Sequence, residues 1–380
     1  MRIRQWALRP WMLPLVAFMV AATPALLQAA PAPSNSFVQH NLVSDIPGLA
    51  SFTDPDLVNP WGVAFSSKSP FWISDNGTGL ATLYNTFGVK QGLIVSIPPP
   101  AGGSSSAPTG QVFNGTSGFA GTHFIFATED GTISGWSGGT SATLEVDQSP
   151  ISSVFKGLAM ATAGGANYLY ATDFHNGAVD VFDSNFSPHT FSAGQFTDPT
   201  LPAGYAPFGI QTFGGNLYVT YALQDPAKHD DMACPGCGFV DVYDSSGNLL
   251  GRLISGGALN SPWGMAFAPA GFGPFSGDLL VGNFGNGWIN VFSPTGTWLA
   301  ALDDTGGNPI VIDGLWNIGF GNGGSGGFAN TLYFTAGING EADGLFGNLG
   351  ATPEPGTLTL LGTGLASLVG YGLRRGKRQA

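Results

Sequence analysis

The stretch Asn59-Pro60-Trp61-Gly62-Val63-Ala64-Phe65 returns later in the chain as Ser261-Pro262-Trp263-Gly264-Met265-Ala266-Phe267. Each copy is followed by a second apolar run that ends in polar residues and glycine, at residues 71–77 and 279–285. Looser copies of the same unit begin near residues 111, 157, 208 and 316. A repeat with a period of roughly 45–55 residues indicates a fold assembled from one supersecondary unit.

Each unit contains further short runs with the alternation of a half-buried strand. A third run recurs at residues 178–182, 239–243 and 288–292, and a fourth at 249–253 and 297–302. Four strands in each unit, joined by turns rich in glycine, asparagine and aspartate, are typical of propeller blades. The sequence therefore predicts an all-β, six-bladed β-propeller with four-stranded antiparallel blades. Five or seven blades remain the alternatives.

The last unit lacks its fourth strand, because its third run at residues 344–348 is close to the end of the repeat region. Residues 37–43 alternate like a strand and precede the first unit. We expect this N-terminal strand to complete the last blade. Such a closure would leave no open sheet edge.

The N-terminal residues 1–30 have the order of a secretory signal peptide. Arginines at positions 2, 4 and 9 precede an apolar run at 12–22 and the small residues near 29–30. This apolar run is too short to cross a membrane comfortably. We predict a signal peptide at 1–30, with a retained membrane anchor as the alternative, and assign 31–350 to the propeller.

The C-terminal residues 351–380 carry a three-part tail. The tail consists of Pro353-Glu354-Pro355, a charge-free apolar segment at 357–373, and a basic end that begins with Arg374 and Arg375. About 17 apolar residues is the lower limit for a transmembrane helix. Basic residues after it would hold that end in the cytoplasm during transient insertion. An ordinary C-terminal anchor is the alternative, and both interpretations place the propeller outside the cytoplasm.

The charge distribution excludes nucleic-acid binding. The chain has 12 Lys+Arg and 24 Asp+Glu, a formal charge of −12. Most of the basic residues lie in the two tails, and the propeller region retains only Lys68, Lys90, Lys156, Lys228 and Arg252. Phosphate binding requires clusters of basic side chains, which this region lacks.

Two resemblances follow from these motifs. The C-terminal tail resembles the PEP-CTERM sorting signal of exopolysaccharide-producing Gram-negative bacteria, which implies processing by an exosortase and delivery to the envelope surface or matrix. The body resembles NHL-type six-bladed propellers and, over residues 37–350, an uncharacterised family of secreted bacterial propellers that often carry this tail. The family motifs are found at residues 41–45, 59–62, 74–79, 128–133 and 341–347. The resemblance implies fold and location, and no activity.

Acidic and amide residues follow the second strand of several blades, so they are expected on one face of the propeller. Hard cations such as Ca²⁺ take six to eight oxygen ligands, and a propeller mouth could collect them from several blades. The candidate ligands are Asp75, Glu129, Asp173 and Asn283. Capping of their own turns is the alternative role for such residues. The recurring Trp61, Trp263 and Trp316 favour packing between blades.

The insertion at residues 224–237 is the least repeat-like stretch. Its candidate metal ligands are Asp225, His229, Asp230 and Asp231. Cys234 and Cys237 are half of a zinc site at best, and a local disulfide is the simplest interpretation in an oxidising compartment.

No nucleophile elbow or phosphate-binding glycine loop is present in the sequence. We therefore expect a non-catalytic surface or matrix module that binds a ligand, a protein or an exopolysaccharide. The alternative is a lactonase-like hydrolase or lyase that depends on a divalent cation, with Ca²⁺ as the possible cofactor.

Overall fold

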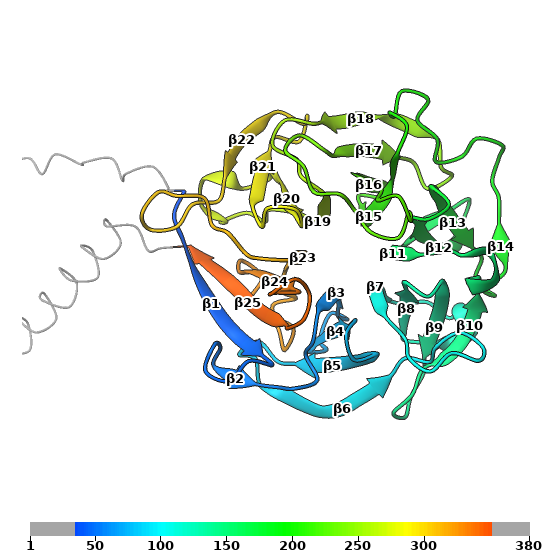
Figure 1. Cartoon of the computed structure of the whole chain (residues 1–380), viewed down its shortest axis with the longest axis horizontal. Coiled ribbons are helices and arrows are strands. Elements are labelled where there is room, and N and C mark those ends of the chain that lie inside the picture. Colours follow the sequence, from blue (N-terminus) through cyan, green and yellow to red (C-terminus); the bar gives the residue numbers. More distant parts are fainter. Residues whose placement is uncertain (1–34, 352–380) are drawn as a thin grey trace, which may run out of the picture. The chain divides into compact units, whose positions relative to one another are not determined.

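The computed structural model describes residues 35–351, and these form six β-sheets arranged as the blades of a ring (Figure 1). The predicted all-β, six-bladed propeller is confirmed. In each blade one strand lies nearest the axis, and three antiparallel strands follow it outward. The predicted starts near residues 61, 111, 157, 208, 263 and 316 each fall in such an inner strand.

The first five blades have four strands each. Blade 1 contains β3 (Pro60–Ala64), β4 (Phe71–Asp75), β5 (Leu80–Tyr84) and β6 (Lys90–Ser96). Blade 2 contains β7 (Pro108–Phe113), β8 (Phe124–Thr128), β9 (Thr132–Trp136) and β10 (Thr143–Asp147). Blade 3 contains β11 (Phe155–Ala163), β12 (Ala166–Asp173), β13 (Ala178–Phe182) and β14 (Pro188–His189).

The fourth and fifth blades repeat this order, and three short 3₁₀ helices lie between strands. Blade 4 contains β15 (Tyr205–Phe213), β16 (Asn216–Leu223), β17 (Phe239–Tyr243) and β18 (Leu249–Ser255). Blade 5 contains β19 (Pro262–Phe267), β20 (Leu279–Asn283), β21 (Ile289–Phe292) and β22 (Trp298–Ala301). The helices are η1 (Phe119–Gly121), η2 (Ser149–Ile151) and η3 (Gly273–Phe275).

The last blade is built from both ends of the described chain. Strands β23 (Leu315–Phe320), β24 (Leu332–Ala336) and β25 (Leu345–Ala351) are completed by β1 (Phe37–Ser44). The pairing runs from Phe37 opposite Ala351 to Ser44 opposite Leu345, which confirms closure by the N-terminal strand. A short fifth strand, β2 (Phe52–Thr53), adds to β1 in parallel and was not predicted.

Most of the core lies between adjacent blades. One apolar cluster contains Ile125 and Phe155, another contains Tyr170 and Ile210, and each joins residues of neighbouring sheets. Buried hydroxyl groups connect the inner strands as well: Thr109 Oγ1 donates to the carbonyl oxygen of Phe155 at 2.7 Å. These contacts hold the blades in a fixed relation to one another.

Two faces follow from the strand directions. The mouth face is the end where each inner strand begins and the second strand finishes, as the pairs Pro60–Asp75 and Pro262–Asn283 show. The tail face is the opposite end, where the inner strands finish at residues such as Phe320.

The tails lie outside the described residues. The predicted signal peptide at 1–30, the motif Pro353-Glu354-Pro355, the apolar segment at 357–373 and Arg374-Arg375 are all in this part of the chain. No helix within residues 35–351 is long and apolar enough to cross a membrane. The apolar segment at 357–373, for which a transmembrane helix was predicted, lies outside these residues.

Candidate functional site

Three tryptophans pack together under the mouth face. Trp61, Trp263 and Trp316 occupy the same position in β3, β19 and β23, and each is at most 4% exposed. Trp61 stacks on Trp316 with ring centres 3.4 Å apart, and Trp263 meets Trp316 edge-on at 5.8 Å. The predicted packing role of these residues is confirmed. The cluster forms an apolar floor beneath the polar groups of the mouth.

Lys156 takes the equivalent position in β11 and is only 1% exposed. Its Nζ atom lies 5.2 Å from the centre of the Trp61 ring and forms ion pairs with Glu129 and Asp230, the latter at 3.1 Å. Burial by itself lowers the pKa of Lys156, but the carboxylates of Glu129 and Asp230 raise it above the ordinary value. The mouth therefore contains a permanent positive charge that belongs to the chain.

A chain of amide hydrogen bonds extends from Glu129 to the last blade. Asn76 Nδ2 donates to Glu129 Oε2 at 2.8 Å, and Asn59 Nδ2 donates to Asn76 Oδ1 at 3.2 Å. Asn59 also donates to Glu341 Oε2 at 2.8 Å and accepts from Trp316 Nε1 at 3.0 Å. Burial, followed by the charge of Glu129, raises the pKa of Glu341 to about 7. Through Lys156, which pairs with both Glu129 and Asp230, residues of blades 1, 2, 3, 4 and 6 thus share one network.

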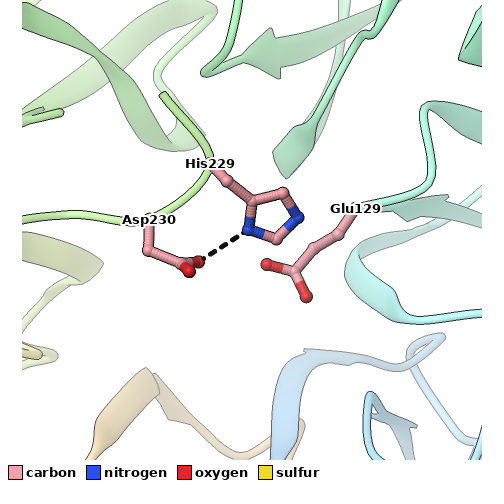
Figure 2. Close-up of side chains that lie close together, drawn as sticks. All are labelled: Glu129, His229 and Asp230. Carbon is pink, nitrogen blue, oxygen red and sulfur yellow. Dashed lines mark hydrogen bonds and ion pairs between the residues drawn. The ribbon is translucent and has the colours of Figure 1, made fainter. Parts of the chain in front are cut away.

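The insertion at residues 224–237 leaves β16 and supplies the exposed part of the site. Figure 2 shows His229 between Asp230 and Glu129, with His229 Nδ1 2.9 Å from Asp230 Oδ1. This contact raises the pKa of His229 and lowers that of Asp230. Asp225 Oδ1 accepts the backbone N–H of His229 at 2.8 Å, so Asp225 shapes the turn. The side chains of His229 and Asp230 are 48% and 65% exposed.

The remainder of the insertion is fastened to blade 5. Cys234 and Cys237 form a disulfide, and the backbone N–H of Ser261 donates to the carbonyl oxygen of Cys237 at 3.0 Å. Asp231 is partly buried, and burial raises its pKa. Its Oδ2 atom has no partner within residues 35–351. These contacts position His229 and Asp230 over the mouth.

The four residues expected to rim the mouth fall on two different faces of their strands. Asp75, Asp173 and Asn283 are the last residues of β4, β12 and β20, whereas Glu129 follows the last residue of β8. Successive residues of a strand point to opposite sides, so a difference of one position reverses the direction of the side chain. The structure therefore brings Glu129 together with His229 and Asp230, and not with the other three.

Asp75, Asp173 and Asn283 each lie in separate surroundings, away from Glu129. Asp173 accepts from the backbone N–H groups of Val154 at 3.2 Å and Asn176 at 3.1 Å, and Asn283 Nδ2 donates to the carbonyl oxygen of Ala258 at 2.8 Å. The contact with Asn176 caps the turn after β12, and the other two contacts join each residue to the segment that precedes its blade. Asp75 is fully buried, and neither of its carboxylate oxygens has a partner in the described chain. Burial raises the pKa of Asp75 well above its ordinary value.

Lys156 was not among the residues that the sequence singled out. The repeat alignment could have identified Lys156, because Lys156-Gly157 aligns with Trp61-Gly62 and Trp263-Gly264. A lysine at a position that is apolar in other blades indicates a buried charge with partners. The isolated sequence of blade 3 does not identify those partners, since they come from β8 and from the insertion of blade 4.

Glu129, His229 and Asp230 are the one group of three or more potential His, Cys, Asp and Glu ligands that meet within 4.8 Å in residues 35–351. Two carboxylates and one imidazole are far fewer than the six to eight oxygens that Ca²⁺ takes. The ammonium of Lys156 also lies against both carboxylates. This donor set does not fit Ca²⁺.

Comparison with known proteins identifies a sorting motif in the tail and finds proteins similar to the propeller. Residues 351–378 match the PEP-CTERM protein-sorting motif, which includes Pro353, Glu354, Pro355, Arg374 and Arg375. This motif implies export, sorting to the bacterial envelope and processing by an exosortase. Among solved structures, the soluble aldose sugar dehydrogenase of Escherichia coli aligns with a TM-score of 0.50 and 12% identity, over 83% of this chain and 100% of that one. At this identity the likeness concerns the fold alone.

Two proteins of Acanthamoeba polyphaga mimivirus match over most of the chain. The uncharacterized protein R648 is 33% identical over 330 residues, covering 81% of this chain and 78% of its own length. The uncharacterized protein L690 is 33% identical over 330 residues, covering 81% and 84%. The chain, whose described residues form a six-bladed β-propeller, therefore belongs to one family with these two uncharacterized proteins and carries the PEP-CTERM motif at its C-terminus.

Proposed function

We propose that the protein is a non-catalytic binding module on the envelope surface or in the extracellular matrix of a Gram-negative bacterium, and that its mouth face binds the partner. In this proposal the signal peptide exports the chain, and an exosortase acts on the tail. A protein and an exopolysaccharide are both compatible with the proposal as the partner.

The observation that carries the proposal is the buried ammonium of Lys156. Its charge is neutralised by Glu129 and Asp230, and it is enclosed by the Trp61 ring. A lysine that acts as a nucleophile or base needs access to a substrate and a lowered pKa. Lys156 has neither, because it is 1% exposed and its pKa is raised. Its role is to fix the groups around it.

The exposed side chains of the site that a partner can contact are those of His229 and Asp230. They project from a loop whose turn is formed by Asp225 and whose end is fastened by the Cys234–Cys237 disulfide. Binding groups on loops fixed by a rigid scaffold are common. A loop that is ordered before binding loses less conformational entropy on association, which strengthens binding.

The direction of the chain ends supports the choice of the mouth face. Ala351 pairs with Phe37 at the tail face, whereas Leu345 pairs with Ser44 at the mouth end of the same strands. The sorting tail therefore begins on the side of the propeller away from His229.

The alternative function, a divalent-cation-dependent hydrolase or lyase, requires an ion in the mouth. The Lys156 ammonium already neutralises Glu129 and Asp230, and the remaining donors do not make up a Ca²⁺ site. We derive no catalytic step from this arrangement.

The proposal is tested by photo-crosslinking in the host cell. A photoreactive amino acid replaces the exposed Ala227 in the insertion, and the control replaces Leu250, which is 57% exposed on the outer strand β18 of the same blade. We expect one protein or polysaccharide adduct from position 227, weakened by His229→Ala and unaffected by a chelator. Equal adducts from both positions, or adducts lost with the chelator, would contradict the proposal.

A further inference from the structure

The tail face contains a cavity that the repeat pattern did not reveal. A space of about 500 Å³ opens between the ends of β3, β15, β19 and β23, and an adjoining space of about 320 Å³ extends it toward β7 and β11. The two share Val63, Phe65, Gln211 and Thr212 among their lining residues. We call this combined space the funnel. Its volume is in the range of small-molecule sites, roughly 300–1,000 Å³.

The walls of the larger space are mainly apolar, and those of the adjoining space are about evenly polar and apolar. Five blades each contribute one large side chain near the end of the inner strand, and each of these side chains is partly exposed: Phe65, Phe113, Met160, Phe267 and Phe320. Phe267 packs edge-on against Phe213 with ring centres 5.0 Å apart, so that part of the wall is held in place. Aromatic and thioether groups favour contact with flat, polarisable rings.

The polar side chains of the funnel are uncharged, and two of them are buried amides. Gln111 is 6% exposed, and its Nε2 donates to the carbonyl oxygens of Gly62 at 2.6 Å and Trp72 at 2.8 Å. Its Oε1 atom has no partner in the described chain. Asn317, also 6% exposed, lines the larger space, and its side-chain amide forms no hydrogen bond within residues 35–351. The unpaired Oε1 of Gln111 is fully buried, whereas the unpaired amide of Asn317 is accessible and free to bond to water or to a ligand.

No charged side chain of the described residues lines the funnel. A charged ligand would lose its hydration there without gaining a counter-ion, which is strongly unfavourable. The walls and the amides together are complementary to a neutral molecule that is mostly apolar and carries a hydrogen-bonding group.

The funnel is separate from the mouth. A Cβ atom on Gly62 would lie 2.4 Å from the carbonyl oxygen of Thr109, and one on Gly264 would lie 2.5 Å from that of Trp316, so neighbouring inner strands are in backbone contact here. The space left between them on the axis is about 10 Å³, enough for one water molecule. A ligand of the funnel therefore does not reach Lys156.

We propose that the funnel is a binding site for a neutral, mainly apolar small molecule that contains a ring system and a hydrogen-bonding group. The rings contact the half-buried phenylalanines, and the polar group reaches the free amide of Asn317. This site is distinct from the mouth face in position and in ligand chemistry.

The test uses two fluorescent probes with one ring skeleton. N-phenyl-1-naphthylamine is neutral and has one N–H donor, and 8-anilino-1-naphthalenesulfonate is the same molecule with a sulfonate. In titrations of the purified chain we expect the neutral probe to bind at one site, at least about tenfold more tightly than the sulfonated probe. Equal affinity for the two probes would overturn the proposal.

Substitutions in the funnel test where the neutral probe binds. Asn317→Leu keeps the size and removes the amide, and should weaken the neutral probe by about threefold to tenfold. Phe320→Glu places a charge on the wall and should abolish binding, whereas Phe320→Leu should retain most of it. His229→Ala on the mouth face is the control and should change nothing. If Phe320→Glu does not fold, as judged by circular dichroism, Met160→Glu takes its place. Binding that survives the charged variant, is insensitive to Asn317→Leu, or is lost with His229→Ala would overturn the proposal.

Discussion

The Nζ atom of Lys156 lies 3.1 Å from Oδ1 of Asp230, so an inner strand of blade 3 is joined by an ion pair to the insertion of blade 4. Glu129 of blade 2 completes the contact. The ammonium of Lys156 is therefore the cation at the centre of the mouth. Its ion pair with Asp230 also positions the neighbouring, exposed His229.

Replacing Lys156 with methionine should destabilise the fold strongly. Lys156→Met keeps most of the length of the side chain but leaves Glu129 in the mouth without its cation. Breaking one side of a buried ion pair typically costs about 3–5 kcal/mol in the free energy of unfolding. Urea denaturation measures the change. Lys68→Met, at an exposed residue without an ion pair in the described chain, is the control. A loss no greater than that of the control would show that Lys156 is not held as described.

The raised pKa of Glu341 predicts a dependence of stability on pH. An unfolded glutamate has its ordinary pKa of about 4.5, and the folded value is about 7. The folded state thus binds a proton more tightly, and this stabilisation is present below pH 4.5 and is lost as the pH rises to 7. Glu341→Gln keeps the acceptor for Asn59 and removes the ionisation. We expect the decrease in unfolding free energy between pH 5 and pH 8 to be smaller in the variant, by roughly 2 kcal/mol. Parallel curves for the two proteins would refute this.

Closure of the ring by β1 gives a prediction with an internal control. Val43 is fully buried in β1, whereas Val38 of the same strand is 37% exposed. Val43→Asp would bury an unpaired charge between blades and should lower the unfolding free energy by at least about 3 kcal/mol. Val38→Asp should change it by less than about 1 kcal/mol. Similar midpoints of urea denaturation for the two variants would be incompatible with a closing role for β1.

The sorting motif predicts where the protein is found. Deletion of residues 352–380 removes the motif and leaves β25 complete. We expect the truncated chain to move from the envelope fraction to the culture medium. Arg374→Ala combined with Arg375→Ala should slow processing, observed as a larger precursor on immunoblots. An unchanged distribution of the truncated chain would argue that the tail does not sort the protein.

The repeat was sufficient to predict the fold because the same strand pattern can be recognised in the sequence of each blade. The inner strand of blade 5 begins with Pro262-Trp263-Gly264 and that of blade 1 with Pro60-Trp61-Gly62, and both pairings have the expected direction. Ring closure was predictable as well, because residues 37–43 alternate and the last unit lacks a strand. The short strand β2 was missed, since two residues carry no periodicity.

The site was less predictable because it depends on strand register and on contacts between distant segments. Glu129 and Asp75 look equivalent in sequence, yet Asp75 is the last residue of β4 and Glu129 follows the last residue of β8. Their side chains therefore point in different directions. The contact between Lys156 and Asp230 joins residues 74 positions apart. No local pattern specifies such a pair.

The most direct test of the account is a cation titration of the melting temperature in the native protein and in Lys156→Met, with Ca²⁺ and Mn²⁺ tested separately. If Lys156 is the cation of the mouth, neither ion raises the Tm of the native protein, and a chelator leaves it unchanged. In Lys156→Met the group of Glu129, His229 and Asp230 becomes free to hold an ion that accepts an imidazole ligand, so its Tm should rise with added Mn²⁺ and not with Ca²⁺. A native protein whose Tm rises with a divalent cation and falls with a chelator would contradict the account.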